Sequence, residues 1–170
     1  MVYTQFIDGA LTTGSKRESW INYNPANNNP LGEAYQANDE DIEAAVNSSE
    51  KAFHIWKNKT GAERGRVLLK TAEILRSRLE PIALLETQDA GKPIAESLVV
   101  DVSSAADALE YFGGMAATIH GEFFDLKNAF GYTRREPLGV CAGIGAWNYP
   151  LQIAAWKAAP ALACGNSMIF

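Results

Sequence analysis

A nearly uncharged stretch toward the carboxyl end decides the fold of this 170-residue chain. The stretch begins Leu138-Gly139-Val140-Cys141-Ala142-Gly143-Ile144-Gly145-Ala146-Trp147-Asn148-Tyr149-Pro150. Its apolar run over residues 138–144, flanked by glycines, is typical of a strand buried on both faces of a parallel sheet. Pro150 suits the first position of a helix, which the alanine-rich residues 151–163 continue until Gly165. Residues 167–170 begin a second apolar run, so the pattern predicts a strand, a helix and a parallel strand.

The residues before this stretch predict a hairpin and then helices. Between Tyr3 and Asn24, apolar residues alternate loosely around the turn formers Asp8-Gly9 and Thr13-Gly14, and residues 24–32 predict a surface turn between strands. Asn38 can cap a helix that runs through Trp56.

Three more helices and one strand are expected further along the chain. A second helix is predicted over residues 62–79, a third from Pro81 to Gly91, and a fourth over residues 93–112 with Gly113-Gly114 as its stop. Residues 130–135 predict an exposed strand that ends at Pro137. The order of elements therefore indicates an α/β fold in which a hairpin and helices precede a parallel sheet.

Composition limits the classes of partner. With 15 Lys plus Arg against 20 Asp plus Glu and 47% hydrophobic residues, the chain has a net charge of −5 and the make-up of a globular protein. No run of Lys and Arg exceeds two residues, which argues against a nucleic-acid partner. The chain has neither a signal peptide pattern nor an apolar window of about 18 residues, so we expect no membrane partner and a cytoplasmic location. Cys141 and Cys164 lack the short spacing of a zinc site, and we expect both to be reduced, buried and inert.

The loop between the predicted strand and helix is the candidate site, because parallel sheets bind ligands beyond the carboxyl ends of their strands. Gly143 and Gly145 do not complete a dinucleotide fingerprint, since position 148 is Asn148, and they serve either a cofactor or close strand packing. The Asn148 amide can donate to a developing oxyanion, or it is an ordinary turn or capping residue.

Three further side chains in the stretch each have either a structural or a functional interpretation. Tyr149 and Trp156 are two helical turns apart, so they either pack in the core or hold a quaternary ammonium group by cation–π attraction. Lys157 is the only charge between Glu136 and Phe170, and it either extends to water or is held by a partner.

These motifs resemble the aldehyde dehydrogenase superfamily, and within it the betaine aldehyde and trimethylaminobutyraldehyde dehydrogenases. The resemblance covers nearly the whole chain, and its most specific part is Trp147-Asn148-Tyr149-Pro150 followed by Trp156-Lys157. Supporting landmarks are Tyr132-Thr133-Arg134-Arg135-Glu136-Pro137-Leu138-Gly139-Val140, Pro160-Ala161-Leu162-Ala163-Cys164-Gly165-Asn166, Asn24-Pro25-Ala26 and Leu85-Glu86-Thr87-Gln88-Asp89-Ala90-Gly91-Lys92.

The resemblance implies an aldehyde dehydrogenase-like α/β fold that is the start of a doubly wound parallel-sheet cofactor domain. Residues 1–121 would form the hairpin and helical part, residues 122–137 the strand region of an oligomerisation arm, and residues 138–170 the first βαβ unit. The strands between Tyr3 and Tyr23 would also contribute to that arm, and dimers or tetramers are the habit of the family.

The resemblance also implies the chemistry, which is oxidation of a small aldehyde to a carboxylate through a cysteine thiohemiacetal. Asn148 would donate to the oxyanion, and Lys157 matches a charge-relay lysine of the family. Gly145, Ala146 and Trp147 match a loop along the cofactor, which would be NAD, with NADP as the alternative.

The remaining site residues implied by the resemblance bind the substrate and a metal ion. Tyr149 and Trp156 match aromatic positions of the aldehyde tunnel that help to cage a trimethylammonium group. Asn22, Tyr23 and Asp89 fall near a site for a monovalent cation such as potassium, two of them through backbone oxygens.

The family's nucleophilic cysteine and general-base glutamate are expected beyond Phe170, after a Lys-Pro-Ser segment that grips the ribose. Neither Cys141 nor Cys164 suits the role of nucleophile, because an apolar environment disfavours the thiolate. The chain alone is therefore predicted to be inactive. Two alternatives stay open. One is a truncated relative with a structural or assembly role. The other is a different nucleotide-binding α/β domain, which the Trp-Asn-Tyr-Pro motif argues against.

Overall fold

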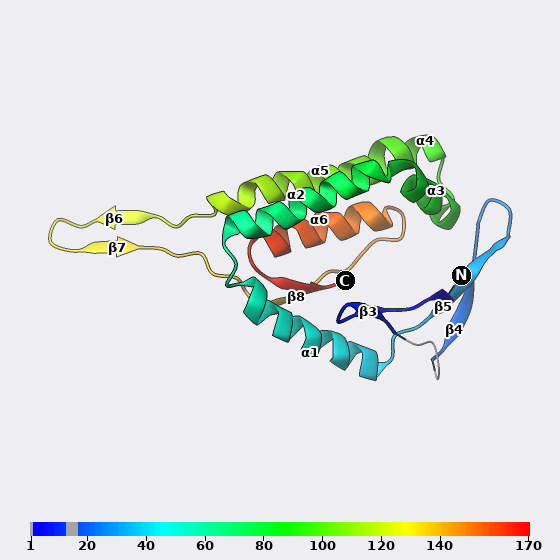
Figure 1. The fold of residues 1–170 in the computed structure, drawn as a ribbon, viewed down its shortest axis with the longest axis horizontal. Coiled ribbons are helices and arrows are strands. Elements are labelled where there is room, and N and C mark those ends of the chain that lie inside the picture. Colours follow the sequence, from blue (N-terminus) through cyan, green and yellow to red (C-terminus); the bar gives the residue numbers. More distant parts are fainter. Residues whose placement is uncertain (1, 13–16) are drawn as a thin grey trace.

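Three helices pack together, mainly through alanine side chains, at the centre of the computed structural model, which describes residues 2–12 and 17–170. They are α2 (Gly61–Ser77), α5 (Ser103–Met115) and α6 (Pro150–Ala163), and α6 lies beside the other two in Figure 1. The shared core consists of small side chains and two leucines: Leu68, Ala72, Ala105, Ala106, Leu109, Ala116, Ala155, Ala159 and Ala163. Small side chains let the helix axes approach closely, so a fixed platform supports the amino end of α6.

Helix α1 (Asp39–Trp56) begins where the sequence predicts. The Asn38 side chain accepts the N–H of Asp41, and the Asp41 carboxylate accepts the N–H of Asn38, which is a capping box. Arg17 forms an ion pair with Asp41 and ties the amino-terminal strands to this helix. At the other end, Trp56 Nε1 donates to the carbonyl of Leu162 at 2.9 Å and so joins α1 to α6.

The predicted second and third helices are present, but the boundary between them is wrong, because α2 ends at Ser77 rather than at residue 79. Helix α2 is capped by Thr60 and Glu63, and α3 (Leu79–Ala90) ends at Gly91, whose φ of 76° is the left-handed conformation expected of a helix stop. The prediction that Pro81 opens α3 is wrong. Arg78 caps both helices, so α3 begins at Leu79, directly after α2 ends.

The predicted fourth helix is interrupted and longer than expected. It consists of α4 (Ile94–Glu96), the π-helix η1 (Ser97–Val102) and α5, with a short 3₁₀ turn, η2 (Ala116–Thr118), after it. The stop predicted at Gly113-Gly114 is wrong, because α5 continues through both residues. Gly113 serves the contact with α2, where a Cβ on Gly65 would lie 2.4 Å from the Gly113 carbonyl oxygen.

The amino-terminal strands form two small sheets, one of which is the predicted hairpin. Strands β2 (Phe6–Ile7) and β3 (Ala10–Leu11) pair around Asp8 and Gly9, whose φ angles are 52° and 79°. The second predicted turn, Thr13-Gly14, lies outside the described residues. Strands β1 (Val2–Tyr3), β5 (Pro30–Tyr35) and β4 (Ser19–Tyr23) form the other sheet in that order. The predicted surface turn joins β4 to β5, but it is shorter than expected because β5 begins at Pro30.

A two-stranded ribbon extends away from the helices (Figure 1). Strand β7 (Phe130–Tyr132) confirms the exposed strand, although it stops before Pro137, and it pairs with β6 (Phe123–Asp125), which the sequence did not predict. The rings of Phe123 and Phe130 stack across the ribbon with centroids 5.7 Å apart.

The predicted strand, helix and parallel strand are confirmed as β8 (Val140–Ala142), α6 and β9 (Ser167–Ile169). The prediction that the first strand is buried on both faces is wrong for this chain, because Leu138 is 94% exposed and Ile144 is 85% exposed. In the described part of the chain β8 pairs with β9 alone, so few atoms cover its flanks.

The two cysteines are free but not buried, which corrects that expectation. Cys164 is exposed because it follows the last residue of α6, and Cys141 is half-buried because β8 lies in a two-stranded sheet.

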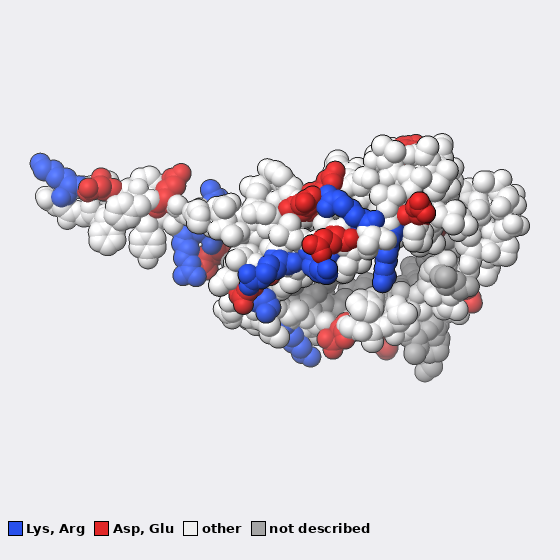
Figure 2. All heavy atoms as spheres, turned by 45° about the horizontal axis from the view of Figure 1, so that its top comes forward, with Lys and Arg blue, Asp and Glu red and all other residues white. Residues whose placement is uncertain are grey.

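Charges of both signs are interleaved over the helices (Figure 2). Arg76 of α2, for example, pairs with Asp107 and Glu110 of α5 at 2.7 and 2.6 Å. None of the helices in the described residues is both long and apolar enough to cross a membrane.

Candidate functional site

The loop that leaves the carboxyl end of β8 presents the Asn148 side chain to solvent. Trp147 and Asn148 form a turn, and Tyr149 occupies the N-cap position of α6. No side chain caps α6, so Asn148 is not a capping residue. Within the described residues the Asn148 amide makes no hydrogen bond, which leaves it available to a ligand oxygen.

The same loop has the form of a nucleotide-binding edge, although its glycines also have a packing role. A Cβ on Gly145 would lie 2.7 Å from Cζ of Phe170, so the loop passes close to this ring. Gly145, Ala146 and Trp147 are all exposed and follow one another at the carboxyl end of a parallel strand. That position fits a dinucleotide lying along the backbone.

Tyr149 and Trp156 face the same neighbouring segment, residues 92–104. The Tyr149 hydroxyl donates to Glu96 Oε1 at 2.5 Å, and this bond to a carboxylate raises the pKa of the Tyr149 hydroxyl. Trp156 Nε1 donates to Ser104 Oγ at 3.1 Å, and half of the Trp156 residue stays exposed. Tyr149 precedes the helix, with φ of −141°, so the two rings share a side of the molecule without following helical geometry.

Lys157 lies beside the loop with its ammonium group in solvent. A Cβ on Gly143 would be 3.4 Å from Cβ of Lys157, which places the base of this lysine against the end of β8. Lys157 is exposed and makes no ion pair with the described residues.

A buried charged cluster behind Tyr149 was missed by the sequence analysis. Lys92 pairs with Asp101, which is fully buried in η1, and the Lys92 ammonium lies 3.7 Å from the centroid of the Tyr149 ring. Glu86 lies against Asp101, and its pKa is raised to about 7, first by burial and then by the neighbouring Asp101 carboxylate. The available signal was Asp101 itself, a lone acid between Val100 and Val102.

The three residues predicted for the cation site meet only in part. Asn22 Nδ2 donates to Asp89 Oδ1 at 2.6 Å, which brings β4 and α3 together, whereas Tyr23 is an exposed neighbour on β4. Nearby, a Cβ on Gly91 would lie 2.6 Å from Cγ of Pro25, so the two landmark segments are in contact.

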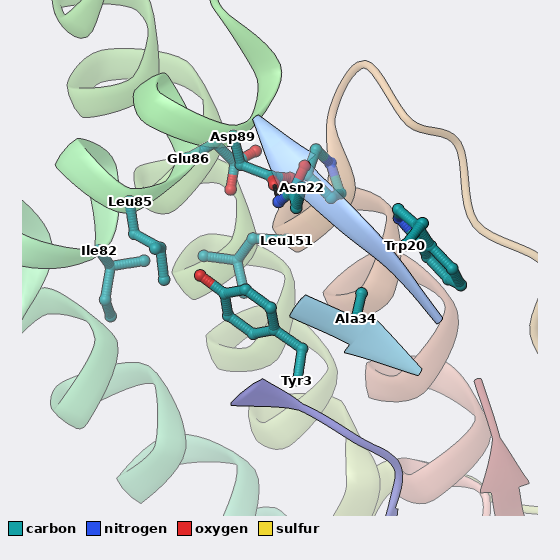
Figure 3. Close-up of a pocket in the computed structure, with 10 residues that line it drawn as sticks. Tyr3, Trp20, Asn22, Ala34, Ile82, Leu85, Glu86, Asp89 and Leu151 are labelled. Carbon is teal, nitrogen blue, oxygen red and sulfur yellow. Dashed lines mark hydrogen bonds between the residues drawn. The ribbon is translucent and has the colours of Figure 1, made fainter. Parts of the chain in front are cut away.

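A cavity of about 490 Å³ adjoins Asn22 and Asp89 (Figure 3). Its polar side chains are Asn22, Glu86 and Asp89, and the rest of its lining is formed mainly by Tyr3, Trp20, Ala34, Ile82, Leu85, Pro150 and Leu151. Carboxylate and amide oxygens suit a hard cation. In the part of the chain that the structure describes, no three His, Cys, Asp or Glu side chains are grouped to hold a metal ion. A monovalent ion at this place would therefore need backbone oxygens as well.

Comparison with known proteins identifies relatives over almost the whole chain. The model of the aldehyde dehydrogenase family matches residues 12–170. Betaine aldehyde dehydrogenase 2 of Rhizobium meliloti (strain 1021) is 51% identical over 167 residues, and betaine aldehyde dehydrogenase of Vibrio vulnificus (strain YJ016) is 48% identical over 170 residues. These matches cover 98% and 99% of this chain and 35% of each relative, so the chain spans about a third of their length.

Solved structures agree with the sequence relatives. The crystal structure of PnpE in complex with nicotinamide adenine dinucleotide matches with a TM-score of 0.94 and 35% identity, over 99% of this chain and 35% of that one. PnpE has also been solved from Pseudomonas sp. WBC-3, and that structure matches with a TM-score of 0.93.

Proposed function

The chain belongs to the aldehyde dehydrogenase family, and from that premise we propose that it forms the amino-terminal part of an enzyme that oxidises betaine aldehyde or a related amino-aldehyde with NAD. Support for the substrate comes from the two betaine aldehyde dehydrogenases that are 51% and 48% identical to it. Support for the cofactor comes from the similarity to PnpE, which was solved with nicotinamide adenine dinucleotide. This chain would be the amino-terminal segment of the whole protein, the complete enzyme.

The exposed, uncapped position of the Asn148 amide is the observation that supports the proposal most directly. Addition of a cysteine thiolate to the aldehyde places negative charge on the carbonyl oxygen, and a fixed neutral donor stabilises that charge without changing its own protonation. The Asn148 amide is exposed at a strand-to-helix turn and is not used as a helix cap. We assign it to this oxyanion.

The loop beside Asn148 would hold the cofactor. Gly145, Ala146 and Trp147 are exposed, and the base of Lys157 lies against Gly143. We assign Lys157 to charge relay. NAD, when bound, supplies the acceptor for the hydride of the aldehyde carbon. The reaction takes up water and yields the carboxylate, NADH and protons.

Tyr149 and Trp156 would select the cationic end of the substrate. A trimethylammonium group cannot donate a hydrogen bond, so aromatic faces are suited to hold it. Both rings face residues 92–104, and Trp156 remains half exposed toward a ligand.

The cation and the remaining catalytic groups complete the proposal. Potassium would bind near Asn22 and Asp89, with Tyr23 contributing a backbone oxygen. Neither cysteine lies in the Asn148 loop, because Cys141 is in β8 and Cys164 follows the far end of α6. The nucleophile and the general base would belong to the complete enzyme outside this segment, so the segment alone would be inactive.

Asn148→Ala in the complete enzyme tests the proposal. Loss of a principal oxyanion donor is expected to lower kcat for betaine aldehyde by roughly 10²- to 10³-fold with a small change in KM. Asn47→Ala is the control, since Asn47 is an asparagine of helix α1 outside the site. An unchanged kcat in Asn148→Ala, measured by NADH formation, would contradict the assignment.

A further inference from the structure

Tyr149 already has a cationic partner inside the protein. The ammonium of Lys92 lies 3.7 Å from the centroid of the ring, which is within the range of a close cation–π contact. The hydroxyl of the same ring is bonded to Glu96 at 2.5 Å. One face and the tip of Tyr149 are therefore both engaged.

The Lys92 contact is built from buried groups. The Lys92 side chain is 10% exposed and Asp101, its ion-pair partner, is 0% exposed. A lysine in such surroundings loses hydration and rotamer freedom, so it is held in one place by Asp101 and by the ring.

The charge of Lys92 does not by itself repel a cationic substrate. Asp101 is in direct contact with the ammonium and neutralises the pair, while Glu96 adds an acidic group at the ring hydroxyl. The electrostatic repulsion between Lys92 and a cationic substrate is therefore small, and the main effect of Lys92 is its contact with the Tyr149 ring.

We propose that Lys92 is a positioning residue for the cationic substrate, which it serves by filling one face of Tyr149 and fixing the ring so that its opposite face meets the trimethylammonium group. This inference rests on the proposed function of Tyr149 and deepens it. Lys92 acts through the ring and does not touch the substrate.

A double-mutant cycle in the complete enzyme tests whether Lys92 acts through Tyr149. The variants are Lys92→Met, Tyr149→Leu and the two combined, and the substrates are betaine aldehyde and its neutral isostere 3,3-dimethylbutanal. Lys92→Met is expected to raise KM for betaine aldehyde about five- to tenfold, with KM for the isostere and both kcat values within about twofold. In the Tyr149→Leu background, Lys92→Met is expected to have no further effect on KM.

Two additional variants keep the result interpretable. Lys92→Met leaves the Asp101 carboxylate unpaired, so Lys92→Met with Asp101→Asn removes both charges and is expected to give the same rise in KM where the single variant folds poorly. Lys57→Met is the matched control, because Lys57 also lies over a ring, Phe53, at 5.0 Å, but it is exposed and directly follows the end of α1. Its kinetics are expected to be unchanged.

Three results would overturn the inference: an unchanged KM for betaine aldehyde, an equal rise for both substrates, or a rise that persists in the Tyr149→Leu background. Failure of the proposed function is distinguishable, because it would show as a wild-type enzyme that does not prefer betaine aldehyde to the isostere. A wild-type preference that is unchanged in Lys92→Met would contradict the role of Lys92 alone.

Discussion

At the scale of single residues, the buried carboxyl group of Glu86, which lies against Asp101, makes the stability of the chain depend on pH. One oxygen of each group is buried without a conventional hydrogen-bond partner, and two adjacent ionised carboxylates would repel each other. A proton on Glu86 removes the repulsion. This agrees with the pKa of Glu86, which burial and the neighbouring Asp101 carboxylate raise to about 7.

The stability of the chain is predicted to fall as pH rises across the range set by Glu86. Its pKa increases on folding from 4.5 to about 7, so the folded state binds more protons than the unfolded state between these values. The contribution is complete below about pH 4.5 and is lost as pH rises through about 7. Urea unfolding at a series of pH values measures this slope.

Glu86→Gln is expected to flatten the slope, because the amide keeps the shape of the protonated acid and does not titrate. Glu80→Gln, an exposed substitution in the same helix, is the control and is expected to retain it. A slope that survives Glu86→Gln would place the proton elsewhere.

Residue chemistry explains which parts of the site could be anticipated from the sequence. Asn148 could be singled out because a strand-to-helix turn has a local signature, and the structure removes its alternative role as a cap. The Lys92, Asp101 and Glu86 cluster could not be found in this way. Its members come from α3, a loop and a π-helix, and they meet only through tertiary packing.

At the scale of secondary structure elements, the crossing of α2 and α5 positions the platform under α6. Gly65 and Gly113 face each other at this crossing, where a Cβ on Gly113 would lie 3.1 Å from Cβ of Leu68. Gly114, the next residue, has no atom within 4 Å of the position its Cβ would take. Gly113 therefore allows the close contact with α2, whereas Gly114 has room for a larger side chain.

Gly65→Ala is predicted to destabilise the chain by about 1 to 3 kcal/mol, because the added methyl group would overlap the backbone of α5. Gly114→Ala is the matched control and is predicted to stabilise the chain by about 0.5 to 1 kcal/mol, since alanine is the better helix former. The free energy of unfolding in urea measures both. Equal effects of the two substitutions would contradict a close α2–α5 contact.

Element boundaries were predictable where a local signal sets them. Asn38 caps α1, Gly91 ends α3, and Pro150 opens α6, each as its own chemistry requires. The helix stop predicted at Gly113-Gly114 was wrong, because glycine permits both a helix stop and a close helix contact, and the sequence alone does not distinguish the two. The burial of β8 also depends on neighbours that are not encoded within the strand.

At the scale of the whole molecule, the ribbon of β6 and β7 stands apart from the helices (Figure 1). Phe123, Phe130 and Tyr132 on this ribbon are 69%, 68% and 70% exposed. Neighbouring exposed aromatic side chains of this size are typical of a protein interface. We propose that the ribbon packs against a second subunit in the complete enzyme.

Phe123→Ser combined with Phe130→Ser is predicted to lower the oligomeric state of the complete enzyme, because the substitutions remove the stacked pair from the proposed interface. Sedimentation velocity measures the mass, and far-ultraviolet circular dichroism checks that the helices persist. Val99→Ser is the control, since Val99 is an equally exposed apolar residue of η1 outside the ribbon. An unchanged mass in the double variant would exclude the ribbon as the main contact.

The central claim is that this segment helps to build a site for an aldehyde with a quaternary ammonium group, and Trp156→Ala in the complete enzyme tests it most directly. The measurement is the ratio of kcat/KM for betaine aldehyde to kcat/KM for 3,3-dimethylbutanal. Loss of a cation–π contact of about 1 to 2 kcal/mol predicts that this ratio falls roughly 5- to 30-fold, while Trp156→Phe keeps most of it. An unchanged ratio in Trp156→Ala, with both substrates losing activity equally, would contradict the claim.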